Sequence, residues 1–199
     1  MIPRHLVIGT AAMLVIALGA AGYAWHLRRQ ISSQPAPAEL SRPALPPSQG
    51  PTEQVTLWVA EDDPGILRPR TAMIPMPGAR QERAEALMRA LLNIYTHEGS
   101  PHPIVPTAEV RTVFLVDPGV AVVDLNRAFA QGHRSGILVE SLTIASMVQT
   151  IAANVPSVTR VKFLIDGKSE ATLAGHADLS VFYEVSAVQQ LAAALQTTP

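Results

Sequence analysis

The side chains best suited to chemistry lie near the C-terminal end of the sequence, in the run Gly175-His-Ala-Asp-Leu-Ser180. His176 stands two residues before Asp178, and a histidine beside a carboxylate is a common general-base arrangement. Asp124 and Asp166, which follow strand-like segments, are further carboxylates that the fold could bring near. Because no nucleophile accompanies them, we favour a structural turn in which His176 bonds backbone groups and Asp178 caps the next segment.

Metal-binding and other catalytic patterns are weak. His97 and His102 flank Glu98 in a loop with Pro and Gly, and a zinc site there would need a further ligand. The Asp62-Asp63 pair lacks the alternating ligand spacing of a calcium loop. The sequence has no cysteine, no phosphate-binding GxxxxGKS/T, no GxSxG of serine hydrolases and no HExxH of zinc proteases. We therefore expect no metal, no cofactor and no catalytic residue.

The N-terminal region contains one long apolar run, residues 6–25, without a formal charge. About 20 apolar residues span a hydrocarbon core of about 30 Å. We predict an uncleaved signal anchor over residues 1–29, with residues 6–25 in contact with membrane lipid. A cleaved signal peptide is the alternative, because small residues near the end of the run suit a peptidase. The flanking arginines divide almost evenly and lean slightly toward a cytoplasmic C-terminus.

The rest of the chain divides by composition. Residues 30–53 hold six prolines and no apolar periodicity, which predicts an extended spacer. We expect a folded domain over residues 54–185 and an amphipathic tail helix over residues 186–199. The 199-residue chain has 15 Lys and Arg against 16 Asp and Glu, a net charge of -1. Since a nucleic-acid-binding protein carries a basic excess, we expect no nucleic-acid partner.

Within the domain, strand-like and helix-like patterns follow one another. Apolar residues recur at helical spacing in Arg80–Tyr95 and in Ile137–Asn154, and Ser135 is placed to cap the second helix. Alternating patterns predict strands at 55–59, 110–116, 120–125, 159–165 and 170–173, with a short extended piece at 71–76. The order β-α-β-β-α-β-β predicts a two-layer α+β fold, with two helices packed against one mostly antiparallel sheet. A capping-box pattern at residues 186–189 predicts the tail helix.

Three stretches, in this order, resemble the GerMN domain, the sporulation and spore-germination domain family. They are Val120-Ala-Val-Val-Asp-Leu-Asn-Arg-Ala-Phe129, Val161-Lys-Phe-Leu-Ile-Asp-Gly-Lys168 and Gly175-His-Ala-Asp-Leu-Ser180. The strand with Trp58 and the segments Leu67-Arg-Pro-Arg-Thr and Ile74-Pro-Met-Pro also fit, so the resemblance covers roughly residues 55–185. Its motif positions are Asp124, Phe129, Asp166, Gly167, Gly175, His176 and Asp178. Family members tend to carry an acidic residue near the start of the second helix, where this chain has Ile137 and Leu138.

The resemblance implies a non-catalytic, membrane-tethered module of the bacterial envelope, with its domain on the periplasmic side of the inner membrane. It implies an envelope protein partner or self-association, and no cofactor. Two alternatives stay open. The first is an envelope module that binds a ligand such as a peptidoglycan fragment, through Trp58, Tyr95 and the loop 102–106. The second is a hydrolase that uses Asp124, His176 and Asp178.

Overall fold

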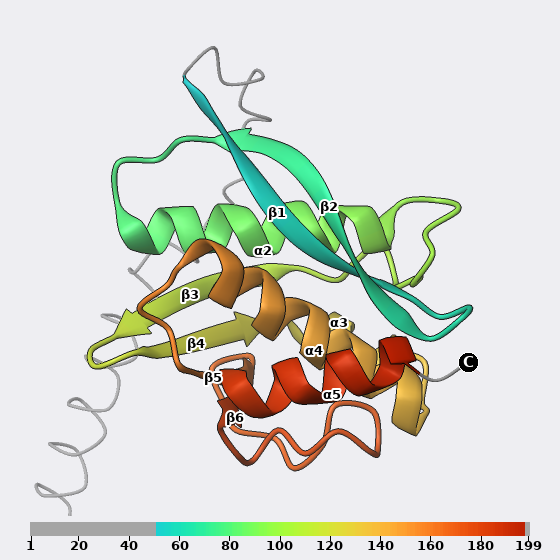
Figure 1. The fold of residues 1–199 in the computed structure, drawn as a ribbon. Helices are drawn as coiled ribbons and strands as arrows, with labels where there is room; N and C mark the ends of the chain where they lie inside the picture. The colour runs from blue at the N-terminus through green and yellow to red at the C-terminus, as the bar shows by residue number, and fades with distance from the viewer. Residues whose placement is uncertain (1–50, 198–199) are drawn as a thin grey trace, which may run out of the picture. The chain divides into compact units, whose positions relative to one another are not determined.

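The computed structural model describes residues 51–197 (Figure 1). The predicted signal anchor over residues 1–29 lies outside the described residues, as does nearly all of the proline-rich spacer. The described residues form an α+β fold with two sheets and four helices. The predicted fold class is therefore confirmed, whereas the prediction of a single sheet is wrong.

The first sheet is a hairpin of two ten-residue strands, β1 (Thr52–Glu61) and β2 (Ile66–Pro75). The strands pair antiparallel along their whole length. From the sequence we predicted only a short extended piece at 71–76. That prediction was too short because most of β2 is exposed and the strand contains Pro69 and Pro75, so it lacks an apolar alternation. Proline is tolerated here because β2 lies at the edge of its sheet.

Helix α2 (Arg80–Thr96) confirms the first predicted helix. All six residues expected on its apolar face are buried: Ala84, Leu87, Met88, Leu91, Leu92 and Tyr95. The helix contacts both strands of the hairpin and also β3 of the second sheet (Figure 1). Because each large side chain contributes roughly 1.5–3 kcal/mol when it is fully buried, this stripe is a main connection between the two sheets.

The second sheet has the strand order β3-β4-β5-β6. The predicted hairpin is confirmed as β3 (Val110–Val116) and β4 (Val120–Leu125). Strand β5 (Arg160–Ile165) pairs parallel to β4, and the two-residue β6 (Tyr183–Glu184) pairs antiparallel to β5. A parallel pair requires a crossover connection, which α4 provides here.

The predicted strand at 170–173 is not present. Only two isolated bridges occur in this region, Ile165 with Lys168 and Thr172 with Asp178. The chain after β5 instead runs as an irregular loop until β6 takes the position beside β5 that we had assigned to residues 170–173. The alternation of so short a segment does not distinguish a strand from a loop held by side-chain bonds.

Two helices occupy the crossover between β4 and β5. The short α3 (Arg127–Gln131), which we did not predict, is capped by the Asn126 side chain, which accepts from the backbone N–H of Phe129. Helix α4 (Ile137–Asn154) has the predicted bounds. Its N-cap is Gly136 without a side-chain cap, so the predicted capping by Ser135 is wrong.

Helix α4 is the core helix of the domain. Every residue from Leu142 to Ile151 is buried. Among the described residues, α4 is the one helix long and apolar enough to meet the length and hydropathy criteria for a membrane span. Its apolar character has another explanation. The helix is buried against α2, α5 and the hairpin, and a helix surrounded by protein is apolar on all sides.

Polar side chains on the helices satisfy the outer edge of β1. Asn154 accepts from the N–H of Thr56 and donates to its carbonyl, and the Thr150 hydroxyl accepts from the N–H of Trp58. The next outward N–H, that of Ala60, donates to the Tyr95 hydroxyl at 2.9 Å. Four residues of helix advance about 6 Å and two residues of strand about 6.6 Å, so residues four apart on α4 match alternate residues of β1.

The last helix, α5 (Val185–Thr197), follows β6 directly. It begins one residue before Ser186, so the predicted capping box does not form its start. The helix contacts α4 and β2, and its residues Val188 and Ala192 are buried. The domain itself therefore covers part of the apolar stripe that the sequence shows in this tail.

Candidate functional site

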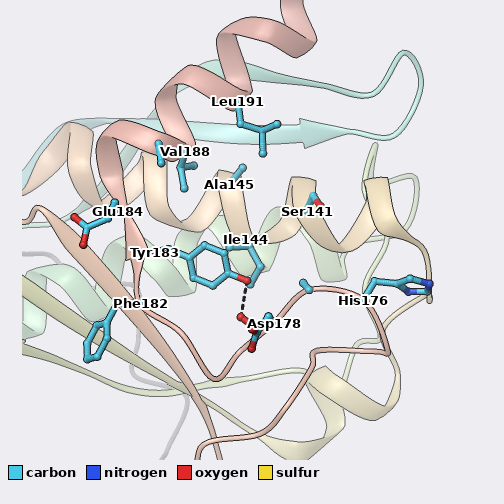
Figure 2. Close-up of a pocket in the computed structure, with 12 residues that line it drawn as sticks. Ser141, Ile144, Ala145, His176, Asp178, Phe182, Tyr183, Glu184, Val188 and Leu191 are labelled. Atoms are coloured by element: carbon cyan, nitrogen blue, oxygen red, sulfur yellow. Dashed lines mark hydrogen bonds between the residues drawn. The ribbon is translucent and has the colours of Figure 1, made fainter.

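A groove of about 460 Å³ lies between α4, α5 and the loop that leads into β6 (Figure 2). Its floor and walls are largely apolar, and its charged lining residues are Asp178 and Glu184. The lining residues are Ser141, Ile144 and Ala145 of α4, His176, Ala177, Asp178, Phe182, Tyr183 and Glu184 of the loop and β6, and Ala187, Val188 and Leu191 of α5.

Glu140 holds the loop that forms one wall of this groove. Its carboxylate is fully buried and accepts from the backbone N–H groups of Ala174, His176 and Ala177 at 2.8–3.1 Å. It also accepts from the N–H of Gly136, which lies at the otherwise uncapped start of α4. Although burial alone would raise the pKa of Glu140, these hydrogen bonds lower it from 4.5 to about 2. Glu140 is thus an ionised anchor between the loop and the core helix.

Glu140 also bears on the departure noted in the sequence. It is an acidic residue in the first turn of α4, two residues after Leu138. The sequence did not reveal its role because a single Glu in a helix is normally solvated. The loop that its carboxylate satisfies lies 34 or more residues later in the chain.

His176 does not belong to a catalytic triad. Its side chain is 41% exposed, and its ring points away from the other lining residues (Figure 2). The Nδ1 atom lies 2.9 Å from Glu140 Oε1 and 3.3 Å from Ser135 Oγ. A Ser-His-acid relay places the serine and the acid on different ring nitrogens. Here both contact the same nitrogen, so the ring cannot take a proton from Ser135 while Glu140 orients it.

Asp178 has the capping role expected for it, whereas the expectation that the His176 ring bonds backbone groups is wrong, because the ring contacts the side chains of Glu140 and Ser135. Its Oδ1 accepts from the N–H and the hydroxyl of Ser180 at 2.7 and 2.6 Å, and these bonds lower the pKa of the carboxyl. Its backbone carbonyl accepts from the Tyr183 hydroxyl at 2.8 Å (Figure 2). Burial, followed by the nearby charges of Asp178 and Glu140, raises the pKa of Tyr183 to about 12. Asp178 and Glu140 are thus two negative charges close enough to the groove to act on the Tyr183 hydroxyl.

The remaining motif residues have structural positions away from the groove lining. Asp124 is buried in β4, where it accepts from the N–H of Gly167 at 2.8 Å and contacts Arg111. Asp166 pairs with Arg111 and Arg127 at the start of the same turn. Among the described residues, no hydrogen bond or ion pair joins Asp124 to His176 or Asp178. The suggested hydrolase constellation is not assembled.

Glycines and one aromatic residue complete the motif. Gly167 and Gly175 adopt φ values of +73° and +118°, in the region that favours glycine. Phe129 is fully buried in the core, with its ring centroid 5.9 Å from that of His133. These three residues therefore build turns and core.

The residues suggested for a metal site and for a ligand-binding site do not come together either. His97 is exposed and contacts the Asn93 carbonyl, whereas His102 is buried between Asp62 and Thr143. Within residues 51–197, no group of three His, Asp or Glu side chains is arranged to hold a metal ion. Tyr95 is fully buried, and neither it nor Trp58 lines the groove.

The groove carries most of its exposed apolar surface at its rim. Phe182 is 49% exposed and Leu191 47% exposed, and Val181 beside Phe182 is 44% exposed. The Phe182 ring carries two cations on its face: Arg160 at 5.5 Å and Lys162 at 5.8 Å from the ring centroid. The sequence pointed to His176 and Asp178 but not to the apolar residues of this site, because its two lining segments, 141–145 and 176–191, are separated by about 30 positions of the chain.

Comparison with known proteins gives one family and a set of similar folds. The family model "Germane: Sporulation and spore germination" matches residues 53–171. No curated protein matches this chain.

Three solved structures are similar in fold. A protein described as a lipoprotein from Clostridium perfringens has 18% identity and a TM-score of 0.46, over 67% of this chain and 87% of that one. The first GerMN domain of the sporulation protein GerM from Bacillus subtilis has 14% identity and a TM-score of 0.44, over 64% and 92%. The tandem GerMN domains of the same protein have 18% identity and a TM-score of 0.45, over 64% and 44%.

Proposed function

This chain belongs to the sporulation and spore germination family, and from that premise we propose that it is a membrane-tethered envelope module that binds another protein. In this proposal, residues 6–25 anchor it in the inner membrane and the proline-rich spacer carries the domain on the periplasmic side. The apolar length of the anchor and the extended character of the spacer support this arrangement.

The observation that carries the proposal is the rim of the groove. Large side chains at protein surfaces are normally scattered, and a cluster of them beside a concavity is typical of an interaction site. Phe182 and Leu191 are each about half exposed on opposite sides of the same hollow. The groove lining between them includes Ile144 and Val188, which the domain itself already buries, so a partner would contact mainly Phe182 and Leu191.

The shape and charge of the groove favour one kind of partner. Two helices, α4 and α5, form its walls, and a third helix laid between them would bury an apolar face. The charged residues that line it, Asp178 and Glu184, are both acidic, and the buried Glu140 adds a further negative charge. We therefore expect the partner segment to be an amphipathic helix with Lys or Arg beside its apolar face.

The cation opposite Glu184 in the sheet leaves this acid available. Arg160 is the direct cross-strand neighbour of Glu184, yet the described residues show no ion pair between them. Arg160 lies instead over the Phe182 ring. A basic side chain of the partner could therefore pair with Glu184 without displacing an existing ion pair.

Non-catalytic action is supported by the bonds that the polar lining residues already make. Asp178 caps its own turn, Ser141 donates to the Ile137 carbonyl, and His176 and Glu140 are joined to each other. An activated nucleophile needs a base within hydrogen-bond reach and a third group that orients that base. These contacts provide no such set.

The site of contact can be tested by photo-crosslinking in intact envelopes. A photoreactive phenylalanine analogue at Leu191 should form an adduct with a basic amphipathic segment of another protein, identified by mass spectrometry. The matched control carries the analogue at Met73, which is 61% exposed on β2 and outside the groove. The charge reversal Glu184→Lys should reduce the adduct several-fold. An adduct with lipid, with a second copy of this chain or equally at Met73 would contradict the proposal.

The placement of the domain has its own test. A reporter fused after Pro199 reads the compartment of the C-terminus. Alkaline phosphatase should be active in this fusion, because it folds only after export, and a cytoplasmic reporter should be silent. The reverse pattern would place the domain in the cytoplasm and refute this part of the proposal.

A further inference from the structure

A chain of short hydrogen bonds crosses the domain behind the groove, through two buried histidines. The Thr143 hydroxyl of α4 lies 2.6 Å from His102 Nε2 and 2.7 Å from His133 Nε2. At the outer ends, His102 Nδ1 lies 2.6 Å from Asp62 Oδ1, and His133 Nδ1 lies 2.7 Å from the Arg134 carbonyl. Both rings are more than nine-tenths buried.

When both histidines are neutral, this chain of hydrogen bonds has one more link than it has hydrogens to form those links. Each of the four links needs one hydrogen between its two atoms. A neutral imidazole carries one N–H, and the threonine hydroxyl carries one O–H, so three hydrogens are available. The Thr143 hydroxyl also lies 3.0 Å from the Val139 carbonyl, one turn earlier in α4, and this contact competes for the same O–H, which makes the shortage larger. Both ends of the chain are acceptors only: the Asp62 carboxylate, which also receives Arg134, and a backbone carbonyl. One contact of 2.6–2.7 Å would then join two lone pairs.

We propose that the folded domain binds one additional proton in this chain at neutral pH and carries it on His102. His102 then donates from Nδ1 to Asp62 and from Nε2 to the Thr143 oxygen. The Thr143 hydroxyl donates to His133 Nε2, and His133 donates from Nδ1 to the Arg134 carbonyl. Each of the four links then has its hydrogen, with the Thr143 O–H given to His133 and not to the Val139 carbonyl. The charge on His102 is adjacent to the Asp62 carboxylate, which also receives the Arg134 guanidinium. The inference is independent of the proposed binding function.

Burial acts against this charge. Burial lowers the pKa of His102 to about 4. Burial also lowers the pKa of His133, although its bond to the Arg134 carbonyl and the charge of Glu140 act in the opposite direction. The buried rings face few other charges: Asp62 and Arg134 at one end and Glu140 beside His133, with the uncharged rings of Tyr95 and Phe129 against them. An unmade bond inside a protein costs more than in water, and a carboxylate 2.6 Å away favours the charged ring. The cost of the unmade bond and the nearby Asp62 carboxylate together outweigh burial, so the hydrogen-bond chain holds the additional proton.

The consequence is a pH-dependent clamp. The chain joins the turn of the β1–β2 hairpin, the loop after α2, the loop before α4 and α4 itself. If the folded domain holds a proton that the unfolded chain releases near pH 6.5, the clamp is fully formed below that pH. It is lost as the pH rises through the higher pKa of the folded state.

Nitrogen NMR of the histidine-labelled full chain in detergent micelles tests the proton directly. At pH 7, His102 should show two protonated ring nitrogens and His133 one. Thr143→Val, which removes the shared hydroxyl, should abolish the imidazolium signature, and Thr143→Ser, which keeps the hydroxyl, should retain it. A single protonated nitrogen on His102 at pH 7 in the wild type would overturn the proposal.

Proton linkage provides the second measurement. The unfolding equilibrium constant of the wild type should rise by up to tenfold per pH unit above about pH 6.5. His102→Gln should remove this slope, whereas His97→Gln should leave it unchanged because His97 is exposed and lies outside the chain. If burial decided the protonation instead, the unfolding constant would rise as the pH falls from 7 to 5. That result would equally overturn the proposal.

Discussion

The buried carboxylate of Glu140 offers the sharpest test of how this domain is held together. In Glu140→Gln, an amide NH₂ group replaces one of the two carboxylate oxygens. If the remaining oxygen keeps the three loop N–H groups, the NH₂ faces the N–H of Gly136, which loses its acceptor at the start of α4. The His176 ring can accept from the new NH₂ by changing its tautomer, so the loss falls mainly on Gly136 and on the charge.

The size of this loss can be reached in two ways, both of which depend on the hydrogen bonds to the carboxylate. Charged hydrogen bonds contribute about 1 kcal/mol more than neutral ones, and one buried unsatisfied donor costs about 1–3 kcal/mol, while a buried charge is also removed. We expect a net loss of roughly 2–4 kcal/mol. Separately, holding the pKa at about 2 instead of 4.5 corresponds to roughly 3 kcal/mol of stability at neutral pH. The two values agree.

Urea unfolding followed by circular dichroism measures this loss, and its pH dependence checks the cause. A carboxyl whose pKa is lowered in the folded state stabilises the fold above its unfolded pKa and loses that effect as the pH falls. The wild type should therefore lose stability between about pH 4.5 and pH 2 more steeply than Glu140→Gln. The control Glu170→Gln, at a half-exposed ion pair, should change stability by less than about 0.5 kcal/mol. Parallel pH profiles for wild type and Glu140→Gln would refute the reasoning.

Three further substitutions test the turn, the strand edge and the loop histidine. Gly119→Ala should lower the free energy of unfolding in urea by about 2 kcal/mol or more, because φ is +69° and a Cβ would lie 2.9 Å from a backbone oxygen. The control Gly167→Ala should lower it by only about 1 kcal/mol, because φ is +73° but a Cβ there would meet open space. Tyr95→Phe should cost about 1–3 kcal/mol, because it leaves a buried N–H of β1 without an acceptor, and Tyr183→Phe should cost less because that hydroxyl is partly exposed. His176→Gln should lower the melting temperature by no more than a few degrees and leave crosslinking at the groove intact. If crosslinking were lost while the melting temperature stayed unchanged, the His176 ring would have a direct functional role.

Elements whose burial repeats along the chain could be predicted from the sequence. The apolar spacing of α2 and the β3–β4 hairpin with its Asp-Pro-Gly turn were correct, because one-sided burial imposes a period of 3.6 or 2. The bounds of α4 were also correct, although this helix is buried all round from Leu142 to Ile151 and its predicted face residue Leu138 is 44% exposed. Strand β2 was mostly missed because it lacks such one-sided burial. It is largely exposed and held by backbone bonds to β1, and backbone bonds leave no trace in the side-chain pattern.

What only the tertiary structure decided is which distant residues meet. The sequence did not indicate that β5 runs parallel to β4, or that Asn154, Thr150 and Tyr95 would serve the edge of β1. It pointed to His176 as the residue of interest, whereas the buried organiser of that loop is Glu140. Polar side chains buried by non-local hydrogen bonds have the same local surroundings in sequence as solvated ones. Their roles are set by the partner's position, which exists only once the chain has folded.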